Sequence, residues 1–133
     1  MDQEMHQIGE AAAQSGLSLR TIRFYEEVGL VPPSGRTAGG FRLYTDADIE
    51  RLQLVKDLKP LDFSLEEMGE VLALLDQLDE QGAEGHAELR DRLDGFAEVA
   101  EQRCADLRAQ LRAAEAVAKQ LRRESGRPAR SRS

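Results

Sequence analysis

Apolar positions in the first half of the chain recur in short helical patterns that end at glycines. Ile8 to Ser15 has one apolar face, and Gly16 follows it at the position where a left-handed residue ends many helices. Ser18 is a good N-cap for a second segment, Leu19 to Val28, which Gly29 ends. The pattern predicts two short helices joined by a tight connection, a helix-turn-helix, which is a weak signal by itself.

The next segment predicts a small β-hairpin. Leu30 to Pro33 is extended because proline restricts the backbone of the residue before it. Gly35 and the pair Gly39-Gly40 are turn residues, and Phe41 to Tyr44 has strand composition. We therefore expect a hairpin wing next to the two short helices.

Two more helices follow the predicted hairpin, from Asp46 to about Lys59 and from Leu65 to about Leu78. Pro60 is expected to stop the first of them a residue or two early. Each begins with a hydroxyl residue followed three positions later by an acid, which is a capping-box signal: Thr45 with Asp48, and Ser64 with Glu67.

The last long segment, from about residue 83 to residue 124, has the Ala, Leu, Glu and Arg composition of a long helix and contains no proline. About 41 residues form a rod of roughly 60 Å. Its apolar positions are mostly spaced alternately by four and three residues. At Cys104 four residues are inserted into this heptad pattern, a stutter, which locally unwinds a supercoil. This seam needs a partner, so we predict dimerisation through ten residues: Leu89, Leu93, Phe96, Ala100, Cys104, Leu107, Leu111, Ala114, Ala118 and Leu121.

Composition limits the remaining possibilities. The length of 133 residues argues for one domain, or for one small domain plus an appendage. We expect domains at 1–78 and 79–124 and a disordered basic tail at 125–133. The chain has neither a membrane-length apolar run nor a secretory signal, so we expect a cytoplasmic protein. The single cysteine, Cys104, excludes an intrachain disulfide and a paired-cysteine zinc site within one subunit.

The net charge of −7 argues by itself against a nucleic-acid partner. The charge is unevenly distributed, however. Residues 17–44 contain four arginines and two acids, a balance of +2, whereas residues 45–76 contain nine acids and three basic groups. The acidic surface therefore lies beyond the predicted helix-turn-helix and hairpin.

The motifs together closely resemble the MerR family of bacterial transcription regulators over about residues 5 to 76. The resemblance implies a mainly α-helical fold in which a winged helix-turn-helix precedes a long helix that forms an antiparallel coiled coil in a homodimer. It also implies binding to double-stranded promoter DNA at a palindrome with an overlong spacer, which is distorted so that RNA polymerase engages both promoter elements. The matching residues are Ile8 to Glu10, Arg20 to Glu27, Gly29-Leu30, Arg36, Gly39 to Tyr44 and Phe63 to Glu67.

Three positions depart from the family pattern. Phe41 stands where many members have tyrosine, which removes a hydroxyl that could reach a phosphate. Pro60 and Asp62 replace the usual non-proline residue and glycine before Phe63.

The second helix of a helix-turn-helix enters the major groove, and its N-terminal part meets base edges. Arg20 and Arg23 are three residues apart, so they share a face from which each could bind guanine or a phosphate. Arg36 and Arg42 are expected on the wing, where they would hold the DNA backbone. Tyr25 has two equally supported roles, a phosphate contact or a wall of the core. The full predicted set for DNA binding is Ser18, Leu19, Arg20, Thr21, Arg23, Tyr25, Arg36, Phe41 and Arg42.

Several alternatives stay open at this point. Cys104 is interpreted as a small core residue, a redox-responsive thiol pair or a two-cysteine metal site across the dimer, and the first interpretation has the most support. A small-molecule effector would bind at the dimer interface. A coiled-coil adaptor is the alternative to a regulator. An enzyme has the least support, because Cys104 and His86 lie about 27 Å apart along one helix and cannot form a dyad. No metal or cofactor is predicted.

Overall fold

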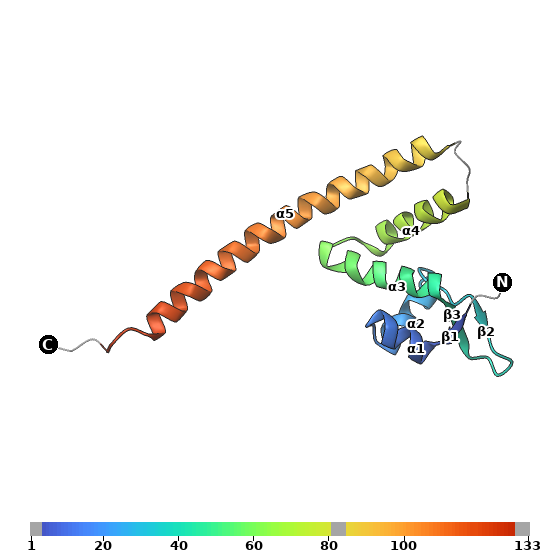
Figure 1. Ribbon diagram of the computed structural model, residues 1–133, viewed down its shortest axis with the longest axis horizontal. Helices are drawn as coiled ribbons and strands as arrows, with labels where there is room; N and C mark the ends of the chain where they lie inside the picture. Colours follow the sequence, from blue (N-terminus) through green and yellow to red (C-terminus); the bar gives the residue numbers. More distant parts are fainter. Residues whose placement is uncertain (1–3, 81–84, 130–133) are drawn as a thin grey trace. The chain divides into compact units, whose positions relative to one another are not determined.

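The computed structural model describes residues 4–80 and 85–129, and it is mainly helical with one small sheet (Figure 1). The chain divides into two compact units, the first ending at Leu93 and the second beginning at Asp94. In chain order the elements are β1 (Met5–Gln7), α1 (Ile8–Ser15), α2 (Leu19–Glu27), β2 (Gly35–Arg36), β3 (Arg42–Thr45), α3 (Asp46–Leu58), the 3-10 helix η1 (Lys59–Leu61), α4 (Leu65–Glu80) and α5 (His86–Ser125). The predicted fold class, a helix-turn-helix with a wing and a long C-terminal helix, is confirmed.

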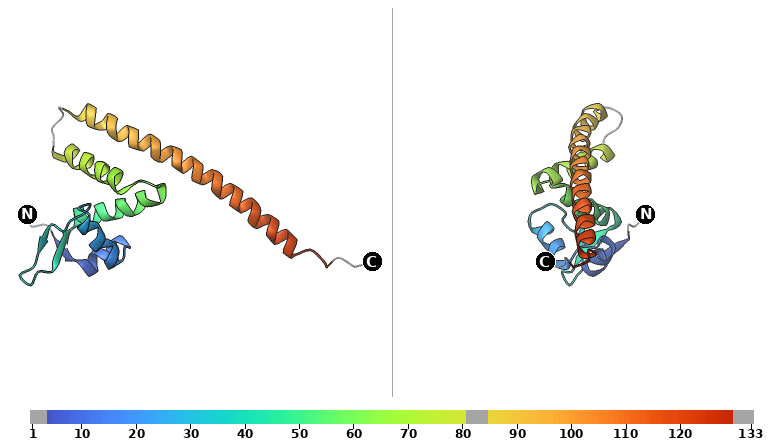
Figure 2. Two further views of the ribbon diagram at one scale, coloured as in Figure 1. Left: turned by 180° about the vertical axis from the view of Figure 1, so that it is seen from behind. Right: turned by 90° about the vertical axis from the view of Figure 1, so that its left-hand side faces the viewer.

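The helix-turn-helix forms as its end signals predict. Gly16 takes the left-handed conformation at φ 76° and donates its N–H to the Ala12 carbonyl at 2.9 Å, which ends α1. Ser18 is the N-cap of α2, and its hydroxyl oxygen accepts the Thr21 N–H at 3.1 Å. The two helices contact each other, and α1 also contacts α3 and the sheet (Figure 2).

The sheet has one strand more than the predicted hairpin. Its order is β1-β3-β2 and both pairings are antiparallel, so β3 is the central strand. The extra strand, β1, pairs Met5 with Thr45 and Gln7 with Leu43. The sequence did not predict β1 because three residues are too few to show an alternating pattern, and pairing with a strand so far along the chain leaves no local signal.

The strand β3 begins at Arg42, one residue later than the strand-like composition suggested. Phe41 belongs to the turn instead. Its carbonyl accepts the Thr37 N–H at 2.8 Å, and its own N–H donates to Thr37 Oγ1 at 3.1 Å. Gly40 supports this turn with φ 86°.

The capping boxes of α3 and α4 are both present. Thr45 Oγ1 accepts the Asp48 N–H at 3.1 Å, and the Asp48 carboxylate accepts the Thr45 N–H at 3.0 Å. Ser64 and Glu67 make the same reciprocal pair at 3.1 and 2.9 Å. α4 continues to Glu80, two residues beyond its predicted end.

The early end of α3 is also confirmed. The helix stops at Leu58, and Pro60 lies in the 3-10 helix that follows, where its missing N–H breaks no α-helical hydrogen bond. Asp62 then turns the chain toward α4 with φ 64°, the left-handed conformation that glycine adopts most easily. The replacement of the usual glycine therefore leaves a non-glycine residue in the left-handed region.

The core of the first unit draws on its α-helices, on β3 and on the loop residues Val31 and Phe63. Asp48 and Thr45 are buried with it through their mutual capping hydrogen bonds. The buried apolar residues are Ala11, Ile22, Tyr25, Val31, Tyr44, Ile49, Leu52, Val55, Phe63, Met68, Val71, Leu72, Leu74 and Leu89.

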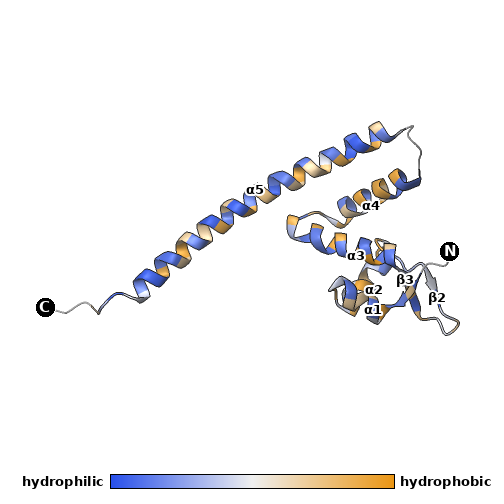
Figure 3. Ribbon diagram, in the orientation of Figure 1, coloured by the Kyte–Doolittle hydropathy of each residue, from blue (hydrophilic) through white to orange (hydrophobic). Residues whose placement is uncertain are grey.

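The second unit consists of the rest of α5 and the residues after it. Its apolar positions recur along a polar helix (Figure 3), and none of its described residues is buried. The expected start of this helix near residue 83 and the tail residues 130–133 lie outside the described residues, and the predicted boundaries at 78 and 124 stay predictions. Among the residues described, no helix is both long and apolar enough to cross a membrane.

We expect Asp62→Gly to stabilise the first unit. Asp62 adopts φ 64°, and the change removes the steric cost of a Cβ in the left-handed region, which is about 1 kcal/mol or less for aspartate. Thermal unfolding followed by circular dichroism is the measurement, with a rise of a few degrees in Tm expected. Asp62→Ala is the matched control and is expected to lower Tm, because it keeps the Cβ and loses the polar group. Equal Tm values for the two variants would contradict the explanation.

Candidate nucleic-acid interface

The helix α2 presents one face to the core and the other to solvent. Ile22 and Tyr25 are buried, whereas Arg20 and Arg23 are exposed. Within residues 4–80 and 85–129, neither arginine makes a hydrogen bond or an ion pair. Two adjacent guanidinium groups on one helix face are therefore available to an anionic or guanine-bearing ligand.

The first turn of α2 has a hydroxyl pair with divided roles. Ser18 caps the helix, and its O–H donates to Thr21 Oγ1 at 2.9 Å. The Ser18 proton is thus engaged. The Thr21 hydroxyl accepts that bond and keeps its own O–H to donate. Of the two predicted donors, Thr21 is therefore the one whose hydroxyl proton this pair leaves free to donate.

Two apolar side chains are exposed beside the arginines, and the sequence analysis identified only one of them. Leu19 belongs to the predicted set, whereas Phe24 does not, although it lies four residues after Arg20 and one after Arg23. Helical phase could have found Phe24, because the core positions Ile22 and Tyr25 place position 24 on the opposite side. An exposed ring at this place can contact a thymine methyl group.

Tyr25 is mainly a core residue. Its side chain is 2% exposed, and burial raises the pKa of its phenol above the usual value. Its ring lies 5.9 Å from the ring of Phe24 in a tilted arrangement. The core role is the better supported of the two predicted roles, and a phosphate contact through the hydroxyl stays a prediction.

The wing arginines share one carboxylate. Arg42 Nε donates to Glu26 Oε2 at 2.7 Å, and Arg36 Nη2 donates to Glu26 Oε1 at 3.0 Å. Arg36 also donates from Nη1 to the Gly40 carbonyl at 3.0 Å. Because Glu26 lies at the end of α2, these bonds join the helix to β2, β3 and the turn between them.

The pairing lowers the pKa of the Glu26 carboxyl below its usual value, chiefly through the hydrogen bond from Arg42. A lowered folded-state pKa stabilises the fold above the unfolded pKa, and this contribution is lost as the pH falls through the folded value. The pair therefore stabilises the wing at neutral pH.

The two ion pairs leave the net charge of +2 for residues 17–44 unchanged, because that count already includes Glu26. They do engage both wing arginines, Arg36 and Arg42, which share the one negative charge of Glu26. Their side chains are 47% and 28% exposed, so Arg36 is the more accessible. Arg42 uses only Nε in the bond to Glu26, and its Nη groups keep N–H donors that a phosphate could accept.

The tip of the wing carries Phe41, which is 65% exposed. Both of its backbone polar groups are held by Thr37, so the turn fixes where the ring projects. The predicted set for DNA binding thus falls into three groups: an exposed face of α2 with its cap, a wing tied to α2, and the buried Tyr25.

The predicted dimerisation residues differ in burial along α5. Leu89 is buried in the first unit and already contributes to its core. In the second unit Cys104 is partly exposed and has a free thiol. Val99 and Val117, which the predicted seam omits, are also exposed, and their spacing of 18 residues places them on one side of the helix. Farther along, the predicted positions Leu107, Leu111, Ala114, Ala118 and Leu121 are all exposed.

Two family models match the chain. The first, described as "MerR HTH family regulatory protein", matches residues 7–75, which include the helix-turn-helix and the wing. The second, described as "MerR, DNA binding", matches residues 49–123, which include α4 and most of α5.

Curated relatives match the first half of the chain. The HTH-type transcriptional regulator HmrR of Sinorhizobium medicae is 45% identical over 67 residues, which are 50% of this chain and 46% of HmrR. The HTH-type transcriptional regulator ZntR of Escherichia coli K12 is 41% identical over 70 residues, 53% of this chain and 50% of ZntR. The matched region is about half the length of these relatives, which are regulators and not enzymes.

A solved structure shares the fold over most of the chain. HiNmlR, a MerR family regulator lacking the sensor domain and bound to promoter DNA, has a TM-score of 0.69 and 24% identity, with 92% of this chain and 94% of that chain covered. The first family model covers α2 and the wing, and the second covers most of the long helix. The chain belongs to the MerR family of DNA-binding transcription regulators.

Proposed function

We propose that this chain forms a homodimer that binds a palindromic promoter and distorts its overlong spacer to control transcription by RNA polymerase. The observation that carries the proposal is the pair Arg20 and Arg23, exposed on α2 beside a wing that Glu26 fixes to the same helix. HiNmlR, which has the same fold, is a regulator bound to promoter DNA.

In this proposal the N-terminal part of α2 lies in the major groove. Arg20 and Arg23 address guanine edges or phosphates, Thr21 donates to a phosphate, and the exposed Leu19 and Phe24 contact thymine methyl groups. The wing follows the backbone with Arg36 and the Nη groups of Arg42. Backbone contacts of this kind set the position of the domain, and the arginines of α2 supply the sequence preference.

The long helix supplies the dimer. From Asp94 to Ser125 no residue of α5 is buried, although leucines recur at the predicted seam positions. Apolar positions on one side of such a long helix are stabilised by a second helix in a coiled coil. An antiparallel partner with full overlap would place the midpoint of α5, next to Ala105, on the two-fold axis and bring Cys104 close to its symmetry mate.

A two-fold dimer explains both the palindrome and the distortion. Each subunit would read one half-site with its own α2. The base pairs between the half-sites would be left uncontacted, so their stiffness and twist determine how easily the DNA is deformed. The regulator would act by changing the relative orientation of the two promoter elements that RNA polymerase engages.

We expect Arg23→Ala to weaken binding to the promoter by about 1 to 3 kcal/mol if Arg23 makes a bidentate base contact. Binding to random DNA should change much less. Gel-shift titrations with the DNA upstream of the chain's own gene and with a random duplex measure the two affinities. Arg112→Ala, which removes an exposed arginine from α5, is the matched control and should leave both affinities unchanged. An equal loss on both duplexes for Arg23→Ala would refute its base-reading role.

We expect Arg42→Ala to weaken binding to every sequence similarly and to reduce the slope of log K against log salt by about 1, since it removes one phosphate contact. Glu26→Gln is the matched counterpart, because it keeps both wing arginines and removes the carboxylate that competes with phosphate for them. Its affinity for random DNA should rise. Measurements at three or more salt concentrations give the slopes, and an unchanged slope in both variants would exclude the wing from the backbone contact.

We expect Leu111→Glu to convert the dimer into monomer, because it places a charge in the centre of the apolar seam. Leu111 is exposed in the single chain, so the change should leave the fold of each chain intact. Arg112→Gln is the control at the next position, since it changes the net charge by the same −1 at an exposed residue outside the predicted seam. Sedimentation equilibrium gives the mass, and a dimer of undiminished stability for Leu111→Glu would contradict the seam.

A further inference from the structure

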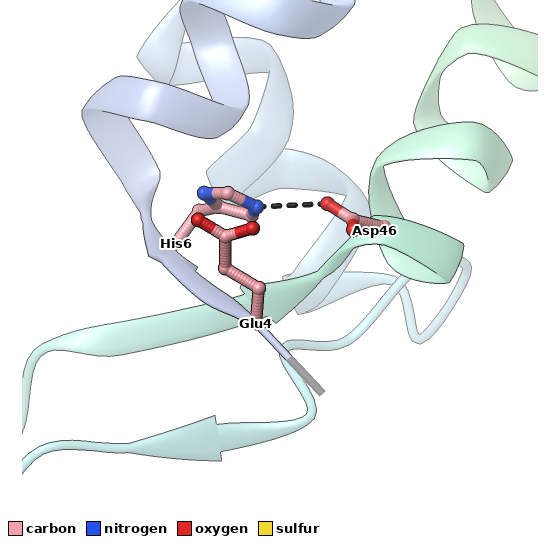
Figure 4. Close-up of side chains that lie close together, drawn as sticks. All are labelled: Glu4, His6 and Asp46. Carbon is pink, nitrogen blue, oxygen red and sulfur yellow. Dashed lines mark hydrogen bonds and ion pairs between the residues drawn. The ribbon is translucent and has the colours of Figure 1, made fainter. Parts of the chain in front are cut away.

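Three side chains that the DNA-binding proposal does not use meet beside the small sheet (Figure 4). They are Glu4, just before β1, His6 in β1, and Asp46 in the first turn of α3. One donor atom from each lies within 4.8 Å of the other two, and His6 Nε2 is 2.8 Å from Asp46 Oδ1. An imidazole nitrogen and two carboxylate oxygens thus converge from two segments that lie 40 residues apart in sequence.

The pairing register of β1 with β3 explains why Glu4, His6 and Asp46 lie close together. His6 pairs with Tyr44 and Met5 with Thr45, and Glu4 and Asp46 are the next residues of the two segments beyond this pairing. Alternate residues of an extended segment project from the same face, which puts Glu4 and His6 together. The pairing therefore brings the carboxylates of Glu4 and Asp46 close to each other, and two like charges at short range are unfavourable.

In the part of the chain that the structure describes, no lysine or arginine balances the carboxylates of this cluster. Among the described residues, neither Glu4 nor Asp46 forms an ion pair with an arginine or a lysine. His6 can donate only one N–H from Nε2, and Asp46 accepts from it. A divalent cation would offset the repulsion between the carboxylates of Glu4 and Asp46. The hydrogen bond between His6 and Asp46 engages only one of these two carboxylates.

We propose that Glu4, His6 and Asp46 bind a divalent transition-metal ion such as Zn²⁺, with water in the remaining positions. Zinc binds imidazole nitrogen and carboxylate oxygen at about 2.0 to 2.2 Å, which separates neighbouring ligand atoms by about 3 to 3.4 Å. The distance of 2.8 Å between His6 Nε2 and Asp46 Oδ1 is close to this range, and the Glu4 carboxylate oxygen lies within 4.8 Å of both ligand atoms. The imidazole favours such an ion over Ca²⁺ and Mg²⁺, which prefer oxygen ligands.

The exposure of the ligands fits an open site. The His6 side chain is 11% exposed and is held by the strand, whereas Asp46 is 67% exposed. One side of the cluster therefore faces the protein and the other faces solvent, where water completes the coordination. A bound ion would join β1, the edge strand, to the first turn of α3, and would stabilise the folded unit because the unfolded chain does not bring the three residues together.

The test is a Zn²⁺ titration of the full chain by isothermal calorimetry, carried out in a Cys104→Ser background so that the thiol contributes no ligand. One Zn²⁺ per chain is expected. His6→Gln should reduce the affinity by about tenfold or more, since loss even of a residue that only supports a ligand costs that much. His86→Gln is the matched control, because His86 is the only other histidine, and it should bind as the Cys104→Ser protein does.

Asp46→Asn provides a second variant at an exposed position and keeps the shape of the side chain. It should also reduce the affinity, and the Zn²⁺-dependent rise in Tm seen for the Cys104→Ser protein should be absent from both ligand variants. Failure of the Cys104→Ser protein to bind Zn²⁺, or equal affinity in His6→Gln and His86→Gln, would overturn the site. The absorption spectrum with Co²⁺ separates the ligand types, since a thiolate charge-transfer band in the wild type alone would assign the ion to Cys104.

Discussion

The carboxylate of Glu26 ties the helix α2 to the wing. It accepts from Arg36 and Arg42 at once, and so fixes the end of α2 to both strands of the wing. A charged group bonded on two sides in a partly buried place orients its partners more strictly than a single surface ion pair does. The wing and α2 therefore form one continuous surface, although β2 and β3 are joined only by a turn.

Local signals in the sequence predicted most of the helical structure. Ser18, Thr45 and Ser64 each cap a helix at the expected place, because an N-cap depends on residues only two or three positions away. The end of α3 before Pro60 is likewise a local effect. β1 was missed for the opposite reason, since three residues form a strand only because β3 offers a free edge.

The same division between local and distant effects applies to the candidate sites. The exposure of Arg20 and Arg23 follows from helical phase and was predicted, whereas the pairing of Glu26 with the wing arginines depends on the tertiary fold and was not. The meeting of His6 with Asp46 is also set by strand register. No composition or spacing in the sequence marks it.

One residue, Thr45, ends β3 and caps α3, so no loop separates the wing from the helix behind it. β3 and α3 meet directly at Thr45. This residue forms hydrogen bonds with Asp48 and pairs with Met5 of β1. If the wing contacts DNA as proposed, a force on the wing would be transmitted through Thr45 to α3, because no loop separates the two elements. Thr45 is therefore the single residue through which the position of the wing is coupled to α3.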